Sequence, residues 1–254
     1  MRLDLYIAEK FSLRSRSMAA NLIKKGAVTV NGKICLKTAF EVSSADSITL
    51  ENENYASLGA YKLQKALDTF GINVAGKKIA DIGASNGGFT DCMLRRNAAV
   101  IYAVDVAECM LDEKLLSDGR VIYKRLNARN LTADDTDGPV DFITVDLSFI
   151  SLKTVIPALK NLLAADGEMV CLIKPQFELG RMAGKSGIVK PEDRRKILND
   201  LSAYFYNQGL TVKDICAVPR IFEDKNVEYT CRLSFRRGDE TPMVFDKEAF
   251  GKIK

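Results

Sequence analysis

The chain has 254 residues, of which 47% are hydrophobic and 28% are charged, and its formal net charge is +4. These values are ordinary for a globular protein, and the length suits one domain of medium size together with a small one. Histidine is absent from the sequence, which excludes Ser-His and Cys-His nucleophilic dyads, histidine general bases and histidine-ligated metals.

The N-terminal segment gives no sign of export, because residues 1–10 lack the continuous apolar core of a signal peptide. The longest apolar run, from Ala98 to Val104, is far shorter than the about 20 residues that a membrane helix needs. The six cysteines include no C-x-x-C pair, which favours buried reduced thiols over a metal site or a disulfide framework. We therefore expect a cytoplasmic protein with no membrane partner and no metal.

Residues 1–50 are predicted to form a small α+β unit. Apolar side chains over residues 3–11 have the spacing of an amphipathic helix, and a second apolar helical stripe ends at Gly26. A β-hairpin is expected next, over residues 28–36, because Asn31-Gly32 supplies the positive φ of a type I′ turn.

The same unit is strongly basic, since residues 1–40 hold eight Lys or Arg against two acidic residues, a net charge of +6. This imbalance indicates a polyanionic partner, although a merely solvated basic face is the alternative. Arg2-Leu3-Asp4, Ser15-Arg16-Ser17 and Val28-x-Val30-Asn31-Gly32 occur in the order in which an S4 RNA-binding domain has them, and the segment resembles that family. The resemblance implies contacts to RNA phosphates, for which the candidates are Arg2, Arg14, Arg16, Lys24 and Lys25.

Residues 51–58 are polar and rich in turn formers, which predicts a linker to a second domain over residues 59–237. The second domain begins with a predicted helix over residues 59–70, whose apolar stripe has Lys62 at its margin. Residues 238–254 show no clear pattern and are expected to be a tail.

A glycine-rich turn follows the first predicted strand, Ile79–Gly83, and leads into a helix that begins at Phe89. Gly83 permits a sharp exit from the strand, and Gly87 and Gly88 remove side chains where a ligand would approach the backbone. A tight corner between strand and helix is the alternative. The turn lacks the G-x-G-x-x-G spacing of dinucleotide binders and resembles the first motif of S-adenosylmethionine (SAM) methyltransferases. That resemblance implies cofactor contacts from Asp81, Gly83, Ser85, Gly87, Gly88 and Phe89.

Strands and helices alternate after residue 77, which predicts an α/β domain with a mostly parallel sheet and helices on both faces. The further strands expected are Val100–Val106, Val121–Lys124, Phe142–Leu147, Met169–Lys174, Val212–Val218 and Glu228–Phe235. The further helices expected are Phe89–Asn97, Met110–Leu116, Leu152–Ala164 and Pro191–Asn207. No helix separates the last two strands, so we expect an antiparallel pair at the sheet edge. Seven strands that close in this way resemble the Rossmann-like fold of SAM methyltransferases.

Polar residues stand where the predicted strands end, which is where ligands bind in open α/β sheets. Asp105, about 20 residues beyond the glycine turn, could accept hydrogen bonds from a ribose. Asn127 follows the next strand and could bond an adenine edge. Asp146 and Lys174 end adjacent central strands, each behind an apolar run, so we expect them to face one another in a cleft.

Lys62, Asp146, Lys174 in Ile-Lys-Pro-Gln-Phe-Glu and Glu228 in Asn-Val-Glu-Tyr resemble the Lys-Asp-Lys-Glu tetrad of FtsJ/RrmJ-like ribose 2′-O-methyltransferases. With the S4-like segment in front, the chain is similar to the TlyA-type family, often labelled haemolysin. The resemblance implies SAM-dependent methylation of cytidine 2′-hydroxyls in ribosomal RNA, a ribosomal subunit as partner, and Asp146 as a cofactor contact too. Leu58 and Asp224-Lys225 depart from the family pattern, and neither removes a tetrad member.

Lys174 is expected to act either as a general base or as a cation that stabilises the developing alkoxide, while Asp146 and Glu228 orient the lysines and the 2′-hydroxyl. A basic, glycine-rich loop follows Lys174, and we expect Arg181 and Lys185 in it to close over RNA. Two other functions remain open at this point, a cytolytic haemolysin and a non-catalytic factor that binds ribosomes.

Overall fold

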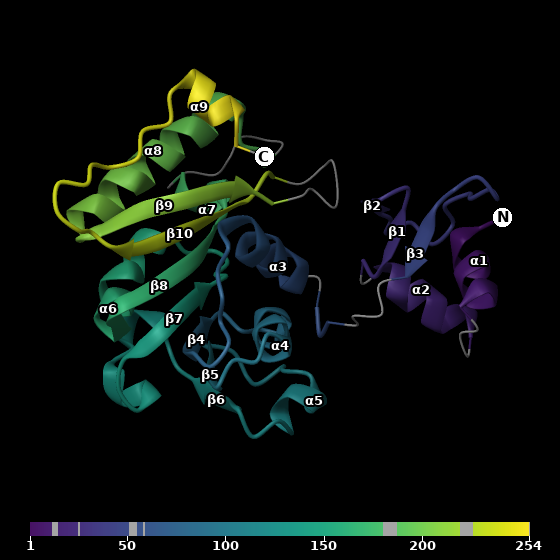
Figure 1. Cartoon of the computed structure of the whole chain (residues 1–254), viewed down its shortest axis with the longest axis horizontal. Coiled ribbons are helices and arrows are strands. Elements are labelled where there is room, and N and C mark those ends of the chain that lie inside the picture. Colours follow the sequence, from purple (N-terminus) through teal and green to yellow (C-terminus); the bar gives the residue numbers. More distant parts are fainter. Residues whose placement is uncertain are drawn as a thin grey trace. The chain divides into compact units, whose positions relative to one another are not determined.

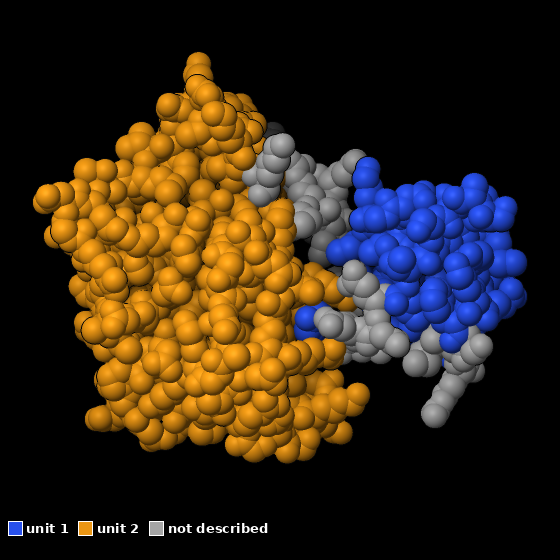
Figure 2. All heavy atoms as spheres, viewed as in Figure 1, with its two compact units in different colours: residues 1–58 blue, residues 59–254 orange. Residues whose placement is uncertain are grey.

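The computed structural model describes residues 1–11, 15–24, 26–50, 55–57, 59–179, 187–218 and 226–253. The chain divides into two compact units, residues 1–58 and residues 59–254, which Figure 2 distinguishes by colour. The predicted RNA contacts Arg14, Lys25, Arg181 and Lys185 lie outside the described residues, as do Leu58 and Asp224-Lys225. Among the helices that are described, none is both long enough and apolar enough to cross a membrane.

The first unit packs two helices against a three-stranded antiparallel sheet of order β2-β1-β3. Its elements are α1 (Leu3–Lys10), α2 (Arg16–Lys24), β1 (Val28–Val30), β2 (Lys33–Ile34) and β3 (Ile48–Leu50). The predicted hairpin is confirmed, with positive φ at both Asn31 and Gly32. The strand β3 was not predicted, because three residues are too few to show an alternating pattern. Leu3, Ile23 and Ile48, from the two helices and this strand, share one buried core.

The second unit is an α/β domain built on a seven-stranded sheet (Figure 1). Its strands are β4 (Lys78–Ile82), β5 (Val100–Asp105), β6 (Val121–Arg125), β7 (Val140–Val145), β8 (Leu163–Ile173), β9 (Leu210–Ala217) and β10 (Tyr229–Phe235). Its α-helices are α3 (Gly59–Phe70), α4 (Gly88–Arg95), α5 (Glu113–Leu116), α6 (Ile156–Leu162), α7 (Pro175–Glu178), α8 (Pro191–Asn207) and α9 (Lys247–Gly251). Short 3₁₀ helices are η1 (Ala128–Asn130), η2 (Ala133–Thr136) and η3 (Leu152–Thr154).

The strand order is β6-β5-β4-β7-β8-β10-β9. The neighbours from β6 to β8 pair in parallel, whereas β10 is antiparallel to both β8 and β9. The predicted seven-stranded, mostly parallel sheet with an antiparallel last strand is therefore confirmed. The structure adds that β10 inserts between β8 and β9, so β9 is the edge strand at that end of the sheet.

Helices cover both faces of the sheet, with α3 and α4 on one side and α6 and α8 on the other (Figure 1). Alternate strand residues, among them Ile82, Val145 and Ile173, share a buried core with the apolar stripes of α6 and α8. Because successive side chains of a strand point to opposite faces, the residues between them face α3 and α4. This alternation decides on which side each polar residue at a strand end lies.

The C-terminal residues differ from the expected tail. Phe245 is only 3% exposed and belongs to the same core as α6 and α8. Asn199 of α8 holds this residue through both of its polar atoms: Oδ1 accepts from Phe245 N at 2.8 Å, and Nδ2 donates to Phe245 O at 3.0 Å. The segment then forms α9, whose Phe250 ring lies 6.4 Å from the ring of Tyr229. Residues 238–253 are thus packed on the domain through Phe245 and Phe250. The sequence did not predict this packing, because one buried aromatic residue gives no periodic pattern.

Two predicted helices have different limits in the structure. The helix expected over Met110–Leu116 begins only at Glu113, because the Asp112 side chain caps it by accepting from Lys114 N. The helix expected over Leu152–Ala164 is divided into η3 and α6, and β8 already begins at Leu163. Neither change moves the strand ends that carry the predicted site.

Candidate active site

The turn after β4 brings this strand against the backbone that follows β7. Gly83 has a φ of 85°, and a Cβ atom placed on it would lie 2.3 Å from the carbonyl oxygen of Asp146. Glycine is therefore required at this position for two reasons: the positive φ of the backbone and the close approach of the Asp146 carbonyl oxygen. The turn and the predicted catalytic carboxylate residue are in direct contact through this glycine.

Gly87 has a packing role in addition to the ligand contact that was predicted for it, which stays a prediction. Its φ is 86°, and an added Cβ would lie 2.2 Å from Leu115 Cδ1 and 2.9 Å from Leu111 Cδ2. The missing side chain thus makes room for Leu111 and for Leu115 of α5. Gly88 and Phe89 begin α4 and are both buried.

Asp81 is placed inside the domain and does not face a ligand. It is fully buried, Thr90 Oγ1 of α4 donates to its Oδ2 at 2.6 Å, and Thr144 Oγ1 of β7 donates to its Oδ1 at 2.8 Å. Burial raises the pKa of this carboxyl group to about 6, against the lowering effect of the two hydroxyl hydrogen bonds. The predicted cofactor contact is corrected here: Asp81 joins α4 to β7 beneath the turn.

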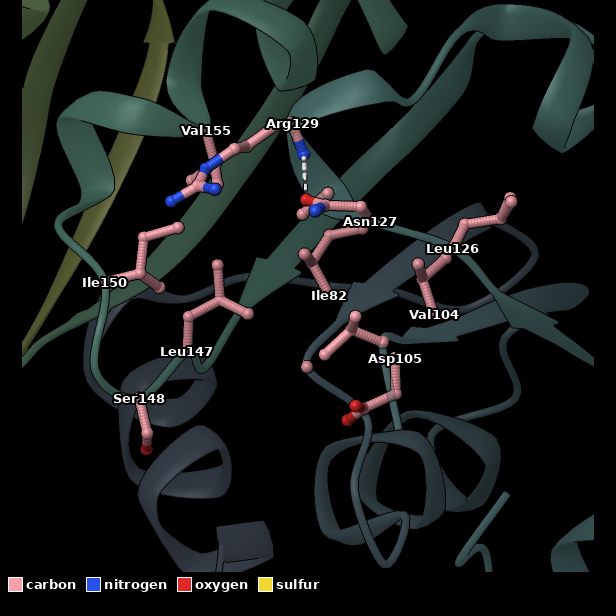
Figure 3. A pocket seen from close by; sticks show the side chains of 13 residues that line it. Ile82, Val104, Asp105, Leu126, Asn127, Arg129, Leu147, Ser148, Ile150 and Val155 are labelled. Carbon is pink, nitrogen blue, oxygen red and sulfur yellow. Dashed lines mark hydrogen bonds between the residues drawn. The ribbon is translucent and has the colours of Figure 1, made fainter. Parts of the chain in front are cut away.

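A cavity of about 240 Å³ opens where β4, β5 and β7 end (Figure 3). Its walls are mostly apolar, with a few polar residues at the strand ends. The lining residues are Ile82, Gly83, Val104, Asp105, Val106, Leu126, Asn127, Ala128, Arg129, Leu147, Ser148, Ile150 and Val155. Of the predicted cofactor contacts, Gly83, Asp105 and Asn127 line the cavity.

The polar groups of the cavity are held by the backbone around them. Asp105 Oδ2 accepts from the backbone N–H of Ser85 at 2.9 Å, and its Oδ1 accepts from Ala107 N at 3.0 Å. Ser85 thus reaches the site through its backbone, at a φ of 48°. Asn127 Oδ1 accepts from Arg129 N at 3.1 Å, the bond drawn in Figure 3. One fixed carboxylate, one amide and apolar walls suit a nucleoside, with the carboxylate as acceptor for ribose hydroxyls.

The four predicted tetrad residues form two ion pairs. Lys62 Nζ on α3 donates to Glu228 Oε2 at 2.6 Å. Lys174 Nζ lies 2.5 Å from Asp146 Oδ1 and donates to Ser148 Oγ at 2.9 Å. The contact to Asp146 lacks the angles of a hydrogen bond, so we describe it as an ion pair. The Lys174 side chain is only 10% exposed, and its charge is therefore compensated in a largely dry position.

The sheet register brings the two pairs to one end of the strands. Tyr229 of β10 pairs with Ile173 of β8, so the next residues outward, Glu228 and Lys174, lie at the same end of this ladder. Both Tyr229 and Ile173 point into the core under α6 and α8. By alternation, Glu228 and Lys174 turn to the opposite face, which is the face from which Lys62 of α3 reaches Glu228.

An exposed aromatic residue beside this cluster was not predicted. Phe149 follows Ser148, is 90% exposed and has a φ of 65°. Positive φ is a genuine outlier for a bulky side chain. Its ring centroid lies 5.0 Å from that of Phe177 on α7. The sequence around Phe149 gives no signal for this conformation. The contact with Phe177 joins two segments that are distant in the chain, and no local pattern predicts it.

The basic residues of the first unit are partly engaged with an acid. Asp4 is buried and accepts hydrogen bonds from the guanidinium groups of both Arg2 and Arg16. These contacts, led by that of Arg2, lower the pKa of Asp4 to about 2. Half of each guanidinium side chain stays accessible, and Lys24 is exposed. In the described part of the chain, no group of three or more Cys, Asp or Glu residues could hold a metal ion.

Comparison with known proteins shows two family matches. Residues 55–231 match the FtsJ-like methyltransferase model, and residues 1–48 match the S4 domain model. The 16S/23S rRNA (cytidine-2′-O)-methyltransferase TlyA of Mycobacterium tuberculosis is 39% identical over 90% of this chain and 87% of its own. Hemolysin A of Brachyspira hyodysenteriae is 36% identical over 90% and 98%. The solved structure of a candidate hemolysin from Streptococcus thermophilus superposes with a TM-score of 0.73 at 32% identity, over 100% of this chain and 94% of that one.

Proposed function

The chain belongs to the FtsJ-like methyltransferase family, and we propose that it transfers the methyl group of SAM to a ribose 2′-hydroxyl of ribosomal RNA, with cytidine as the target nucleoside. The observation that carries this proposal is the placement of the Lys62–Glu228 and Lys174–Asp146 pairs at one end of the sheet. Ser148, which accepts a hydrogen bond from Lys174, lines the cavity that suits a nucleoside. The S4 domain and the activity named for the mycobacterial relative support RNA as the substrate.

The nucleoside part of SAM fits the cavity that Asp105 and Asn127 line. When bound, this cofactor supplies a methyl group on a sulfonium centre, which an oxygen nucleophile can attack. A ribose hydroxyl is a weak nucleophile until its proton is drawn away. Lys174 is the group to do this, because its amine is fixed between Asp146 and Ser148. As the neutral amine it would accept the proton, and as the cation it would stabilise the negative charge that develops on the oxygen.

The second pair, Lys62–Glu228, closes the site on the side of α3. Its two charges compensate each other, so the pair can orient the hydroxyl without placing a net charge beside it. Phe149 offers a large exposed ring next to the same cluster. Aromatic faces stack on nucleobases whatever their sequence, and this ring is therefore our candidate for the contact to the target base.

The proposal is tested with purified ribosomal subunits and tritiated SAM. Lys174→Ala should lower methyl transfer at least 100-fold, because the group that handles the proton is lost, while SAM affinity stays within about threefold. Lys196→Ala is the matched control, since this lysine lies on α8 with 69% of its side chain exposed. Resistance to alkaline cleavage, read nucleotide by nucleotide, identifies the 2′-O-methyl product. A Lys174→Ala protein that transfers at the rate of the control would contradict the assignment.

The name of the Brachyspira relative makes cytolysis the second candidate. The same preparation should therefore be added to erythrocytes without SAM. If the unmodified chain and Lys174→Ala lyse erythrocytes equally and no methyl group is transferred to rRNA, cytolysis would replace the enzymatic proposal. Binding to ribosomal subunits without any transfer would instead favour a non-catalytic factor.

A further inference from the structure

The short helix α7 contacts the segment after β7 at three successive points. Lys174, at the N-cap position of α7, contacts Asp146 and Ser148. The Phe177 ring lies against Phe149. Further along, the carboxylate of Glu178 accepts from Ser151 Oγ at 2.5 Å and from Leu152 N at 2.9 Å. We call residues 146–152 the β7 loop.

Glu178 takes no part in the proposed chemistry, although it is a carboxylate in a largely dry place. Burial raises its pKa, while the hydrogen bonds from Leu152 N and Ser151 act in the opposite direction. A half-buried carboxylate costs free energy unless its oxygens are satisfied, and here both oxygens are used to hold the β7 loop. Glu178 thus fixes the far end of the loop, and Lys174 fixes its near end.

Between these two anchors lies Phe149, the residue with positive φ. A bulky residue in this conformation is strained and persists only where its surroundings enforce it. The described contacts that can enforce it are those from α7 on either side. The residues next to it, Ser148 and Ile150, line the nucleoside cavity, so the shape of this loop affects both the catalytic lysine and the cofactor.

We propose that Glu178 is a positioning residue of the methyltransferase site: by bonding Ser151 and Leu152 it holds the β7 loop in the shape that presents Phe149 outward and Ser148 to Lys174. This inference rests on the proposed function for its catalytic consequence only. The structural consequence, a loop that loses its fixed shape without Glu178, can be measured without any methyl transfer.

The sequence contains no tryptophan, so Phe149→Trp gives a single fluorescent reporter at the exposed tip of the β7 loop. In this background Glu178→Ala should lower the steady-state anisotropy at least 1.5-fold, because the reporter then moves with a loop that is no longer fixed. Glu178→Gln should resemble the parent, because its amide oxygen can accept from Leu152 N and its amide nitrogen can donate to Ser151 Oγ.

Asp135→Ala is the matched control in the reporter background. The Asp135 carboxylate likewise accepts from a backbone N–H and a hydroxyl, both of Thr132, at the start of the 3₁₀ helix η2 before β7. The substitution removes the same kind of cap outside the β7 loop, and the fluorescence of the reporter should not change. An equal change in Asp135→Ala and Glu178→Ala would overturn the proposal, because it would show a general loss of stability.

Methyl transfer is then compared without the reporter. Glu178→Ala should lower kcat at least tenfold, since displacing a catalytic group by about 1 Å costs about 100-fold, and Glu178→Gln should recover kcat to within threefold of the unmodified chain. Should Glu178→Ala not fold, Ser151→Ala removes one of the two loop contacts and should give a smaller change in the same direction. Unchanged fluorescence and unchanged kcat in Glu178→Ala would overturn the proposal. If the unmodified chain transfers no methyl group, the proposed function fails, and the fluorescence still decides whether Glu178 fixes the loop.

Discussion

Gly83→Ala tests the link between the glycine turn and the catalytic pair. The added methyl group would lie 2.3 Å from the carbonyl oxygen of Asp146, at a φ of 85°. The backbone conformation alone costs an L-residue roughly 1–2 kcal/mol, and forcing a group into filled space adds about 1–3 kcal/mol. We therefore expect unfolding free energy to fall by about 2–5 kcal/mol, which is about 4–20 °C in Tm for a domain of this size.

Gly76→Ala separates the two contributions. Gly76 has a φ of 72°, close to that of Gly83, but an added Cβ finds no atom within 4 Å. This variant should lose only the conformational part, roughly 1–2 kcal/mol. Thermal unfolding followed by circular dichroism gives both shifts, and single-turnover methyl transfer is measured well below both midpoints. There, Gly76→Ala should react like the unmodified chain.

Gly83→Ala should also react more slowly even where it is fully folded. The atom that the methyl group meets belongs to the backbone of Asp146, which must move and carry its carboxylate away from Lys174. A displacement of about 1 Å at a catalytic group costs about 100-fold in rate. If the two variants have equal midpoints and equal rates, the turn does not position Asp146 and the reasoning is wrong.

Three further outcomes follow from the charges and exposed groups of the structure. Burial raises the pKa of Asp81 to about 6 from 3.8, so the native state keeps this proton to a higher pH than the unfolded chain does. Between pH 4 and pH 7 the unmodified protein should therefore lose roughly 2 kcal/mol of unfolding free energy that Asp81→Asn does not lose, measured by urea unfolding at both pH values. Parallel pH dependences would contradict the burial. Asp4→Ala should weaken binding to rRNA in filter assays although it removes a negative charge, because Arg2 and Arg16 lose the carboxylate that orients them. Tighter binding would show that the net charge of the first unit matters and the orientation of the two arginines does not. Phe149→Ala should leave the Tm almost unchanged, since the ring is 90% exposed, and should lower kcat/KM roughly 5- to 150-fold, the equivalent of one base stack of about 1–3 kcal/mol; a change below twofold would remove this ring from the substrate site.

The sequence predicted those elements that have a strong local pattern. The helix Pro191–Asn207 has the predicted limits, because proline at its first position and a long apolar stripe mark both its start and its face. The strand order at the C-terminal end was not predictable in the same way. The absence of a predicted helix between β9 and β10 indicates that the two strands pair, whereas the insertion of β10 beside β8 depends on contacts between residues far apart in the chain.

The candidate site shows the same division between local and distant information. The residue types of the tetrad could be recognised from their motifs, but Lys62 and Glu228 are 166 positions apart, and no local pattern indicates their contact. Asp81 was misassigned for a related reason. An acidic residue before a glycine turn looks the same whether it faces a ligand or the interior, and its partner Thr144 lies 63 positions away.

The alternation of the sheet explains why three of the four tetrad residues need no unusual loop to meet. Asp146, Lys174 and Glu228 each adjoin a strand residue that is buried under α6 and α8, namely Val145, Ile173 and Tyr229. A side chain one position along a strand turns to the other face, so Lys174 and Glu228 are directed toward α3 by the same packing that fills the core. Because a shift of one residue in the pairing of β10 with β8 would turn Glu228 to the wrong face, the register Tyr229↔Ile173 fixes the core and the site together. Lys62 then needs only a helix on that face, which α3 provides.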